Sequence, residues 1–373
     1  MDRRNFLKGS SAAALAVGTA TATEALAAKA TDDAQTLASP ALVAQRRRLR
    51  MLSLWPDAVA GPGDHVRRFA KRIEAATDGG WVIEISDRPM TEADAFKAVM
   101  VGDADLYVGH EHAHRALHPA FSYFAGLPCG TGMSIDQMNA WLVAAGGQEL
   151  WDDLAAEFNM KGLVIGHSGR THGLFTRRPV HTSADLRGKR IATVGLAADV
   201  LLATNAMPVD IVAGSARAMN NDASVDGIEL YGTAIMEVPA TARAQFHQTA
   251  NHRLRPGLND TGFAFSLGLR RSLWDGFANA ERILLSALAA ESLAGSRAET
   301  LAETRSIDMV SEEHAHAGSS AAPGNWTVVA EQLSRIAETI VADLAGHDDH
   351  ARRINASYMA FKGGPRPVAA VQS

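Results

Sequence analysis

The alternation of short apolar strands with amphipathic helices is the feature that most restricts the fold of this chain. Leu49 to Trp55 is an apolar run ended by Pro56, as expected for a buried strand. Apolar residues then recur at the i, i+3, i+4 and i+7 positions from Val66 to Ile73, which is the spacing of an amphipathic helix. A second apolar run, Trp81 to Ile85, follows. Strands separated by helices predict a mostly parallel sheet that is covered by helices.

The rhythm recurs along the middle of the chain and changes near Ser272. Further strands are predicted at 105–109 and 209–212, with helical patterns between them. From Ser272 the pattern changes to two long helical runs, Trp274–Glu303 and Trp326–Leu344. The residues therefore predict an α/β body followed by a helical C-terminal third.

The first 27 residues have the anatomy of an export signal. The pair Arg3-Arg4 precedes a short, alanine-rich apolar run that closes with an Ala-x-Ala site at Ala27. Paired arginines are typical of the Tat route, which carries folded proteins. We therefore expect residues 1–27 to be a cleaved Tat signal peptide, residues 28–48 to be a linker, and the mature protein to be periplasmic. The alternative is an uncleaved membrane tether.

The bulk properties exclude several classes of protein. At about 150 residues per domain, the length indicates two domains, and 47% hydrophobic residues suffice for a sizeable core. The formal charge of −5 argues against nucleic acid as a partner. Cys129 is the only cysteine, so neither an internal disulfide nor a thiolate zinc cluster can form. Beyond the signal, no apolar stretch reaches the roughly 18 residues of a membrane span, so we expect a soluble mature protein.

Several short segments, taken in order, resemble one protein family. They are Phe69–Gly80, Phe96–Asp105, His118–Phe121, Gly126–Gly130, Trp141–Asp152 and Ala356–Phe361. Together they resemble the extracytoplasmic solute receptors of TRAP transporters, the DctP-like group. Within this family, the segments most resemble the branch that binds small keto- and hydroxy-acids.

The resemblance implies an α/β, two-lobe periplasmic-binding-protein fold with mostly parallel or mixed sheets, crossing hinge strands and a long C-terminal helical segment. The first lobe would comprise residues 49–168, completed by residues about 250–275, and the second lobe residues 169–249. Residues 272–362 would form the helical segment that spans the lobes, and residues 363–373 a tail.

The resemblance also implies a function. Such a receptor would bind a small keto-, hydroxy- or dicarboxylic acid and deliver it to integral-membrane TRAP transporter subunits. The mechanism would be lobe closure, so we expect no enzyme activity and no cofactor. Whether the protein forms a homodimer is left open.

The arginine that holds the ligand carboxylate in this family is missing. The family motif D-L-x-G-x-x-x-R implies an arginine whose planar fork binds a carboxylate bidentately. Here the motif begins at Asp185 and delivers Ala192 at that position. Arg190 lies two residues earlier, on the same face of a regular strand, and is either a stand-in or a charge at the rim.

Arg170 is the better candidate for a ligand anchor. The resemblance to the acid-binding branch places Arg170 on a metal-holding glutamine, and Glu229 and Asp260 on acidic positions of the same site. A guanidinium and a metal ion compete for the same carboxylates, so we expect Arg170 to replace the metal, to pair with Glu229 and to bind the ligand. A metal ion on Glu229 and Asp260 is the weaker alternative. A further alternative is that Arg170 and Glu229 form a purely structural ion pair. In that case Ala192 would indicate a receptor for an uncharged solute.

His112, His114, Tyr231 and Asp260 are expected to line the same site. The histidines replace aromatic residues of the acid-binding branch and would offer hydrogen-bond donors to an oxyanion or a hydroxyl. They would make the wall more polar than the aromatic wall of that branch.

A histidine-rich metal site is the competing interpretation. His110, His112 and His114 alternate beside Glu111, a spacing that metal ions accept on a strand. Such a site would indicate an exported metal-dependent enzyme. No H-E-x-x-H motif, G-x-S-x-G nucleophile or phosphate-binding glycine loop supports an enzyme. The second histidine cluster, residues 312–316, is expected to be a solvated loop.

Overall fold

The computed structural model of the chain describes residues 46–53, 55, 62–86, 91–209, 224–231, 249–315 and 323–363, with the backbone alone at 62, 303–315 and 323–325. The expected signal at 1–27 and the expected tail beyond Gly363 lie outside the described residues. Within the described part of the chain, no helix has both the length and the hydropathy needed to cross a membrane.

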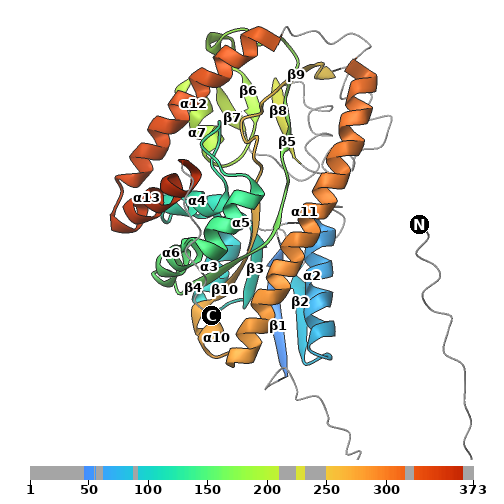
Figure 1. Cartoon of the computed structure of the whole chain (residues 1–373), viewed down its shortest axis with the longest axis vertical. Helices are drawn as coiled ribbons and strands as arrows, with labels where there is room; N and C mark the ends of the chain where they lie inside the picture. The colour runs from blue at the N-terminus through green and yellow to red at the C-terminus, as the bar shows by residue number, and fades with distance from the viewer. Residues whose placement is uncertain are drawn as a thin grey trace, which may run out of the picture. The chain divides into compact units, whose positions relative to one another are not determined.

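Five strands form the first sheet, in the order β2-β1-β3-β10-β4 (Figure 1). Their bounds are β1 Arg47–Ser53, β2 Trp81–Ser86, β3 Leu106–Gly109, β4 Met160–His167 and β10 Ala264–Arg270. β1 is parallel to β2 and β3, whereas β10 is antiparallel to β3 and β4. β1 begins inside the stretch that was expected to be linker, and the Arg47 guanidinium packs 5.0 Å from the ring centroid of Phe277.

Five strands also form the second sheet, in the order β7-β6-β8-β5-β9. Their bounds are β5 Thr171–Thr176, β6 Arg190–Ala192, β7 Met207–Val209, β8 Gly227–Tyr231 and β9 His252–Leu254. β6 is parallel to β7 and β8, and β5 is antiparallel to β8 and β9. The predicted two-lobe α/β fold is confirmed, and both sheets are mixed because each includes one strand that enters from the other lobe.

The two lobes are joined where the chain crosses from β4 to β5 and returns from β9 to β10. We call these segments, residues 168–171 and 259–263, the hinge. They pair through the Ser168 amide and the Phe263 carbonyl at 2.8 Å, and through the Thr171 amide and the Asp260 carbonyl at 3.3 Å. Gly169 and Gly262 both have positive φ, and a Cβ on Gly262 would lie 1.7 Å from the Gly169 carbonyl oxygen. Only glycine fits this crossing.

Helices cover both lobes. Their bounds are α2 Pro62–Ala76, α3 Glu92–Val101, α4 Ser122–Ala125, α5 Ile135–Ala144, α6 Gly147–Ala156, α7 Leu196–Ala203 and α10 Arg271–Asp275, with 3-10 turns η1 Glu111–His114, η2 Pro119–Phe121 and η3 Ser183–Leu186. The predicted apolar face of α2 is buried: Val66, Phe69 and Ile73 join the apolar cluster of the first sheet. α3 begins at Thr91, whose hydroxyl accepts the Asp94 amide at 3.1 Å.

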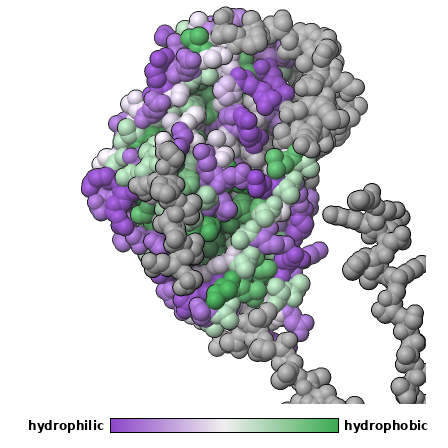
Figure 2. Space-filling model, in the orientation of Figure 1, coloured by the Kyte–Doolittle hydropathy of each residue, from purple (hydrophilic) through white to green (hydrophobic). Residues whose placement is uncertain are grey.

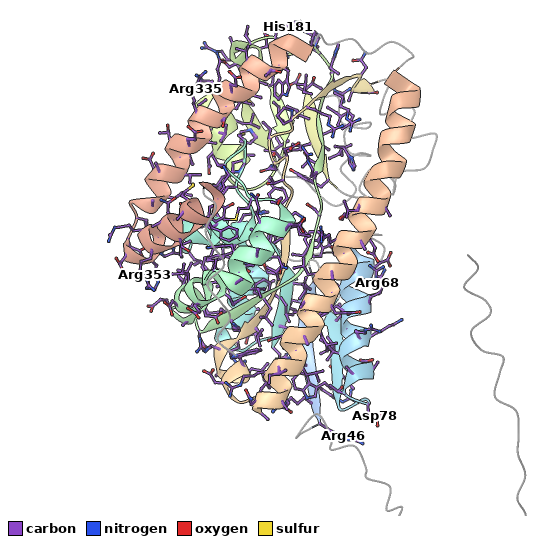
Figure 3. The ribbon with its side chains drawn as sticks, in the orientation of Figure 1. Arg46, Arg68, Asp78, His181, Arg335 and Arg353 are labelled. Carbon is purple, nitrogen blue, oxygen red and sulfur yellow. The ribbon has the colours of Figure 1, made fainter. Side chains whose placement is uncertain are left out.

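Three C-terminal helices follow: α11 Asn279–Ala315, α12 Pro323–Ala345 and α13 Asp349–Gly363. The expected loop at 312–316 is wrong at residues 312–315, because α11 continues to Ala315. α11 packs Leu285 on the first sheet and reaches the hinge at Thr300. On the outer side of the lobe, Arg68 of α2 pairs with Glu299 of α11 at 2.6 Å (Figure 3).

α12 contributes to the cores of both lobes. Trp326, Val329 and Leu333 are buried in the second-lobe cluster, and Val341 is buried in the first-lobe cluster. Figure 2 shows that α11, by contrast, presents a pale apolar stripe at the surface, and Ile283 is exposed on this helix. Within its described residues, the C-terminal segment thus ties the two lobes together through α12.

A glycine and a tyrosine face each other across β3 and β10. Gly268 pairs with Tyr107, and a Cβ on Gly268 would lie 1.8 Å from Cε1 of the tyrosine ring. Tyr107 is buried and donates a 2.6 Å hydrogen bond to Oε1 of Glu111. The ring therefore occupies the space that a side chain at 268 would need.

We expect Gly268→Ala to lower stability by about 1–3 kcal/mol, because the added methyl group overpacks a buried ring that cannot move away. The matched control is Gly295→Ala on α11, where no atom lies within 4 Å of the added Cβ. That change should stabilise the helix by about 0.5–1 kcal/mol. Thermal unfolding midpoints report both effects, and equal midpoints for the two variants would contradict the packing account.

Glu111 is a buried, ionisable carboxyl in the same core. Burial raises the pKa of its carboxyl to about 7. A pKa that is higher in the folded state means that the carboxyl contributes most stability below its ordinary pKa of about 4.5, and that this contribution is lost as the pH rises through about 7.

Glu111→Gln should remove this pH dependence, since an amide still accepts the Tyr107 hydroxyl but does not ionise. Relative to the variant, the wild type should lose about 2–3 kcal/mol of unfolding free energy between pH 5 and pH 8, since the loss runs from the ordinary pKa of about 4.5 to about 7. Urea unfolding at the two pH values measures the difference. The control is the exposed Glu84→Gln, whose unfolding free energy should change with pH as that of the wild type does. The prediction is wrong if Glu111→Gln shows the same pH dependence as the wild type.

Candidate ligand-binding site between the lobes

The turn after β3 meets the start of α7, so first-lobe and second-lobe residues touch there. A Cβ on Gly195, just before α7, would lie 3.5 Å from Cγ of His112. Nearby, Arg115 forms an ion pair with Asp199 on α7. Because these residues come from different sheets, any rotation of one lobe against the other changes both contacts.

Aromatic rings from both lobes gather around Phe263 of the hinge. Its ring centroid lies 5.1 Å from Tyr231 of the second lobe and 5.4 Å from His112 of the first. His110 lies 5.8 Å from Phe263 and 5.3 Å from Trp55. We call these five residues the interlobe wall. Such an apolar and imidazole surface fits the planar face of a small organic molecule.

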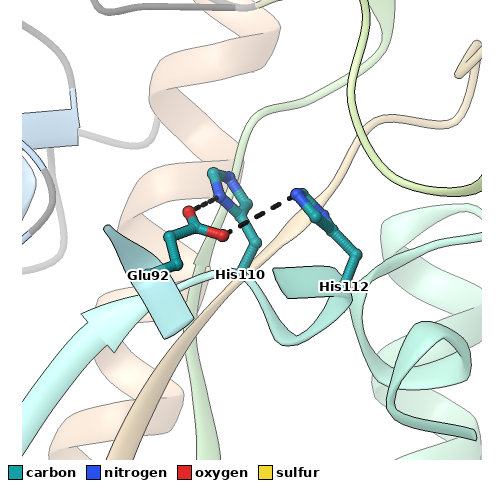
Figure 4. A group of neighbouring side chains, drawn as sticks. All are labelled: Glu92, His110 and His112. Atoms are coloured by element: carbon teal, nitrogen blue, oxygen red, sulfur yellow. Dashed lines mark hydrogen bonds and ion pairs between the residues drawn. The ribbon is translucent and has the colours of Figure 1, made fainter. Parts of the chain in front are cut away.

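Glu92 stands beside the two histidines of the wall (Figure 4). Its Oε1 is 2.7 Å from Nδ1 of His110, and its Oε2 is 3.8 Å from Nε2 of His112. Burial opposes ionisation of Glu92, but attraction to His110 and the hydrogen bond with it outweigh burial, and the pKa of Glu92 is lowered. Burial lowers the pKa of His112 to about 3, so this ring is neutral at neutral pH.

His114 does not line the site, which corrects the prediction for this residue. Its ring is fully buried in the first lobe, 4.0 Å from the centroid of Phe96, and its Nε2 lies 3.1 Å from the Tyr107 hydroxyl. The competing metal interpretation, which placed alternate histidines on one strand face, is also wrong in its geometry, because residues 111–114 form the 3-10 turn η1. In that turn Glu111 and His114 face the core, while His112 contacts Phe263 at the interlobe wall.

Glu229 is fully buried and is held by uncharged donors. Its Oε1 accepts the Asn259 amide at 2.7 Å, and its Oε2 accepts Asn259 Nδ2 at 2.9 Å. The hydroxyls of Tyr231 and Thr193 donate to Oε2 at 3.1 and 3.2 Å. Burial raises the pKa of Glu229, while these hydrogen bonds act to lower it. The predicted ion pair between Arg170 and Glu229 is wrong, because the donors around Glu229 are those of Asn259, Tyr231 and Thr193.

Arg170 pairs instead with Asp260 across the hinge. The arginine side chain is 66% exposed and the aspartate side chain is 19% exposed. A guanidinium carries five N–H donors, and only Asp260 accepts from Arg170 within the described residues. Asp260 also lines a cavity of about 310 Å³ between the hinge, the turn at Cys129 and α12.

Ala192 and Arg190 share strand β6 beside this network. Ala192 is buried between Val209 and Ile228 of the neighbouring strands, and the next residue, Thr193, is the one that reaches Glu229. The Arg190 amide donates to Asp226 at 3.0 Å, and within the described residues its buried Nε has no partner. Ala192, where the family arginine is expected, therefore lies next to the buried Glu229 carboxylate. That Arg190 substitutes for this arginine stays a prediction.

The carboxylates at this position are engaged by protein donors. Both oxygens of Glu229 accept hydrogen bonds, and Oδ2 of Asp260 pairs with Arg170. The metal-free site that the sequence predicts stays a prediction.

Sequence reasoning missed five of the residues that form this region: Glu92, Thr193, Asn259, Phe263 and Trp55. Asn259 and Phe263 flank Asp260 in one short segment, and the resemblance drew attention to the acid alone. Glu92 is distant in sequence from His110, and only the parallel pairing of β1 with β3 brings the start of α3 to the turn after β3. A carboxylate at the start of a helix carries no local signal for such a contact.

Comparison with known proteins agrees with this architecture. A monocarboxylate 2-oxoacid-binding periplasmic protein of Nostoc sp. is 25% identical over 160 residues, which is 41% of this chain and 42% of that protein. The match therefore spans less than half of the relative's length.

Solved structures match over most of the chain. A TRAP periplasmic solute-binding protein from Colwellia psychrerythraea with bound calcium and pyruvate has a TM-score of 0.72 at 17% identity, covering 85% of this chain and 94% of that one. One from Bordetella bronchiseptica RB50, with calcium and picolinate bound, has a TM-score of 0.72 at 20% identity, covering 85% and 92%. At these identities the likeness establishes the fold.

The family follows from a direct match to its sequence model. The match is to DctP, the bacterial extracellular solute-binding proteins of family 7, and it covers residues 62–315. This is a family of solute-binding proteins rather than enzymes, and the match includes the second sheet, the hinge and every strand of the first sheet except β1. Because it spans more than half of the sequence, the chain belongs to family 7 of the bacterial extracellular solute-binding proteins.

Proposed function

We propose that this chain is a periplasmic receptor that binds a small organic acid between its lobes and delivers it to TRAP-type membrane subunits. The observation that carries the proposal is the position of Phe263. Its ring contacts Tyr231 from the second lobe and His112 from the first, so one hinge residue joins both halves of the interlobe wall. A ligand held against this wall would contact both lobes at once.

The choice of an acid rests on relatives and on Arg170. The Nostoc relative is named for binding monocarboxylate 2-oxoacids, and the Colwellia structure holds pyruvate. In this chain the exposed Arg170 guanidinium keeps donors beyond its pair with Asp260, and planar guanidinium donors suit a carboxylate. Arg170 is therefore the proposed anchor, in place of the arginine missing at Ala192.

An uncharged solute is the second candidate, and two observations favour it. Asp260 already neutralises Arg170, and Ala192 supplies no second cation. The neutral imidazole of His112 would then donate to a hydroxyl rather than to a carboxylate.

Transport would follow from lobe closure. Closure is a population shift, and its size is limited by the difference in ligand affinity between the open and closed states. The contact of His112 with Gly195 and the ion pair of Arg115 with Asp199 join the two lobes and would be lost on opening. The membrane subunits would recognise the closed receptor. The Tat route and a homodimer stay predictions.

The ligand class can be tested by thermal shift with pyruvate, malonate and neutral polyols, each with and without Ca²⁺. A ligand at one hundred times its Kd should stabilise the protein by about 2.7 kcal/mol. We expect a shift with an acid that does not depend on Ca²⁺, because Arg170 would take the place of the metal beside Asp260. A shift with neutral polyols alone would contradict the acid and support the second candidate.

Arg170→Gln should weaken binding of the acid by about tenfold to a hundredfold, since hydrogen bonds to a charged group contribute roughly 1.5–3 kcal/mol. The exposed guanidinium places the expected loss toward the lower end of this range. Isothermal titration measures the affinity. The matched control is Arg335→Gln on the exposed face of α12 (Figure 3), which should bind as the wild type does. Equal affinities for all three proteins would remove Arg170 as the anchor.

Breaking the ion pair between the lobes should shift the protein toward the open state. Arg115→Gln removes a half-buried pair, so we expect ligand affinity to fall by a few-fold, or roughly 0.5–1 kcal/mol. Arg353→Gln, which breaks an exposed pair with Asp153 inside the first lobe, is the control and should have no effect. Small-angle scattering without ligand should show a more extended Arg115→Gln protein. An unchanged affinity and profile would mean that the pair does not favour closure.

A further inference from the structure

Three donor atoms converge at the interlobe wall, where α3 begins and β3 ends. The carboxylate oxygens of Glu92, Nδ1 of His110 and Nε2 of His112 offer ligand atoms that all lie within 4.8 Å of one another (Figure 4). The two imidazole rings stack at 5.0 Å with an interplanar angle of 16°, so both rings stand on the same side of the carboxylate. The three side chains therefore enclose one point in space.

The spacing is compatible with a shared ion, although Glu92 and His110 alone are at hydrogen-bond distance. Two donor atoms on one four-coordinate Zn²⁺ ion lie roughly 3.3 Å apart, given metal–ligand distances of about 2.0–2.2 Å. The distance from Glu92 to His110 is 2.7 Å and that from Glu92 to His112 is 3.8 Å, so the two values bracket this separation. The second distance is too long for a hydrogen bond.

His112 is the residue that hydrogen bonding leaves unexplained. Within the described residues its buried Nδ1 has no hydrogen-bond partner, and its Nε2 comes no closer to Glu92 than 3.8 Å. An unsatisfied buried polar group costs about 1–3 kcal/mol, so a histidine at this position calls for a partner that is absent from the protein itself. Nε2, which faces Glu92, also forms no hydrogen bond within the described residues, so its lone pair is available to a metal ion while Nδ1 keeps the proton.

The surroundings supply what a transition-metal site needs. Two imidazoles and one carboxylate are the donor set that Zn²⁺ and its neighbours in the first transition row prefer. Phe263 packs against both histidines, and Trp55 packs against His110, so an apolar shell holds the ligands. Three protein ligands leave a fourth position for a water or for an oxygen of a bound solute.

The other carboxylate–histidine group in the first lobe is built differently. Nδ1 of His118 accepts the Ala120 amide at 3.2 Å, and its Nε2 lies 2.8 Å from Asp348. Both nitrogens of this histidine are therefore engaged, although His347 and Asp348 also lie within ligand distance of it. This second group is a hydrogen-bonded pair and serves as a matched control.

We propose that Glu92, His110 and His112 bind one divalent transition-metal ion of the Zn²⁺ class where the two lobes meet. The site is separate from the Glu229 and Asp260 position and does not depend on which solute the receptor carries. Because His112 also contacts Gly195 of the second lobe, a bound ion would lie at the contact between the lobes.

The test is metal binding to the full chain purified without a histidine tag. Isothermal titration with Zn²⁺ should show one site, and Co²⁺ in its place should give the visible absorption of a four-coordinate ion with nitrogen and oxygen ligands. Glu92→Gln and His110→Gln should each weaken Zn²⁺ binding by at least tenfold. Asp348→Asn should bind as the wild type does. Organic acids are left out, so the result is independent of the proposed ligand.

Thermal unfolding of the same proteins separates a lost ligand from a lost fold. With saturating Zn²⁺ the wild type and Asp348→Asn should gain stability, while Glu92→Gln and His110→Gln should keep a cooperative transition that Zn²⁺ does not shift. Should one of these two variants fail to fold, the other decides. The proposal is overturned if the wild type binds no Zn²⁺, if both variants bind it as tightly as the wild type, or if Asp348→Asn abolishes binding.

Discussion

The crossing of two backbone segments at Gly169 and Gly262 is the constraint on which the rest of this structure depends. The carbonyl of Gly169 occupies the space where any side chain at 262 would begin. The chain crosses here from β4 to β5 and returns from β9 to β10, and β5 and β10 are the antiparallel strands that make the two sheets mixed. The crossing also places Arg170, Asp260 and Phe263 side by side, so the hinge and the candidate ligand site are built from the same few residues.

The ionisable groups near the hinge are divided by burial. Glu229 is buried and is satisfied by amide and hydroxyl donors, so it needs no cation. Asp260 is partly exposed and takes Arg170, where water screens the pair. A fully buried guanidinium beside Glu229 would need all of its donors satisfied. Asn259 instead donates hydrogen bonds to the carboxylate without burying a second charge.

The fold was predictable from the sequence because its signals are local. The apolar spacing of α2 and the runs that became β1 and β2 each identify their element without knowledge of the rest of the chain. The site was predictable only in part. Tyr231 and His112 do lie at the interlobe wall, but His114 faces the core because the chain forms a 3-10 turn after β3. Glu92 joins His110 only through sheet pairing, which no short stretch of sequence records.

The packing of α12 has a mechanical consequence for the receptor. Leu333 and Ala337 are buried in one lobe and Val341 in the other, so a single helix is packed into both lobes. Two lobes that pack on one helix cannot separate freely. Their relative motion requires α12 to bend or to slide against its buried contacts. The resistance to opening is therefore set along α12, and residues that never touch a solute tune how readily it is released.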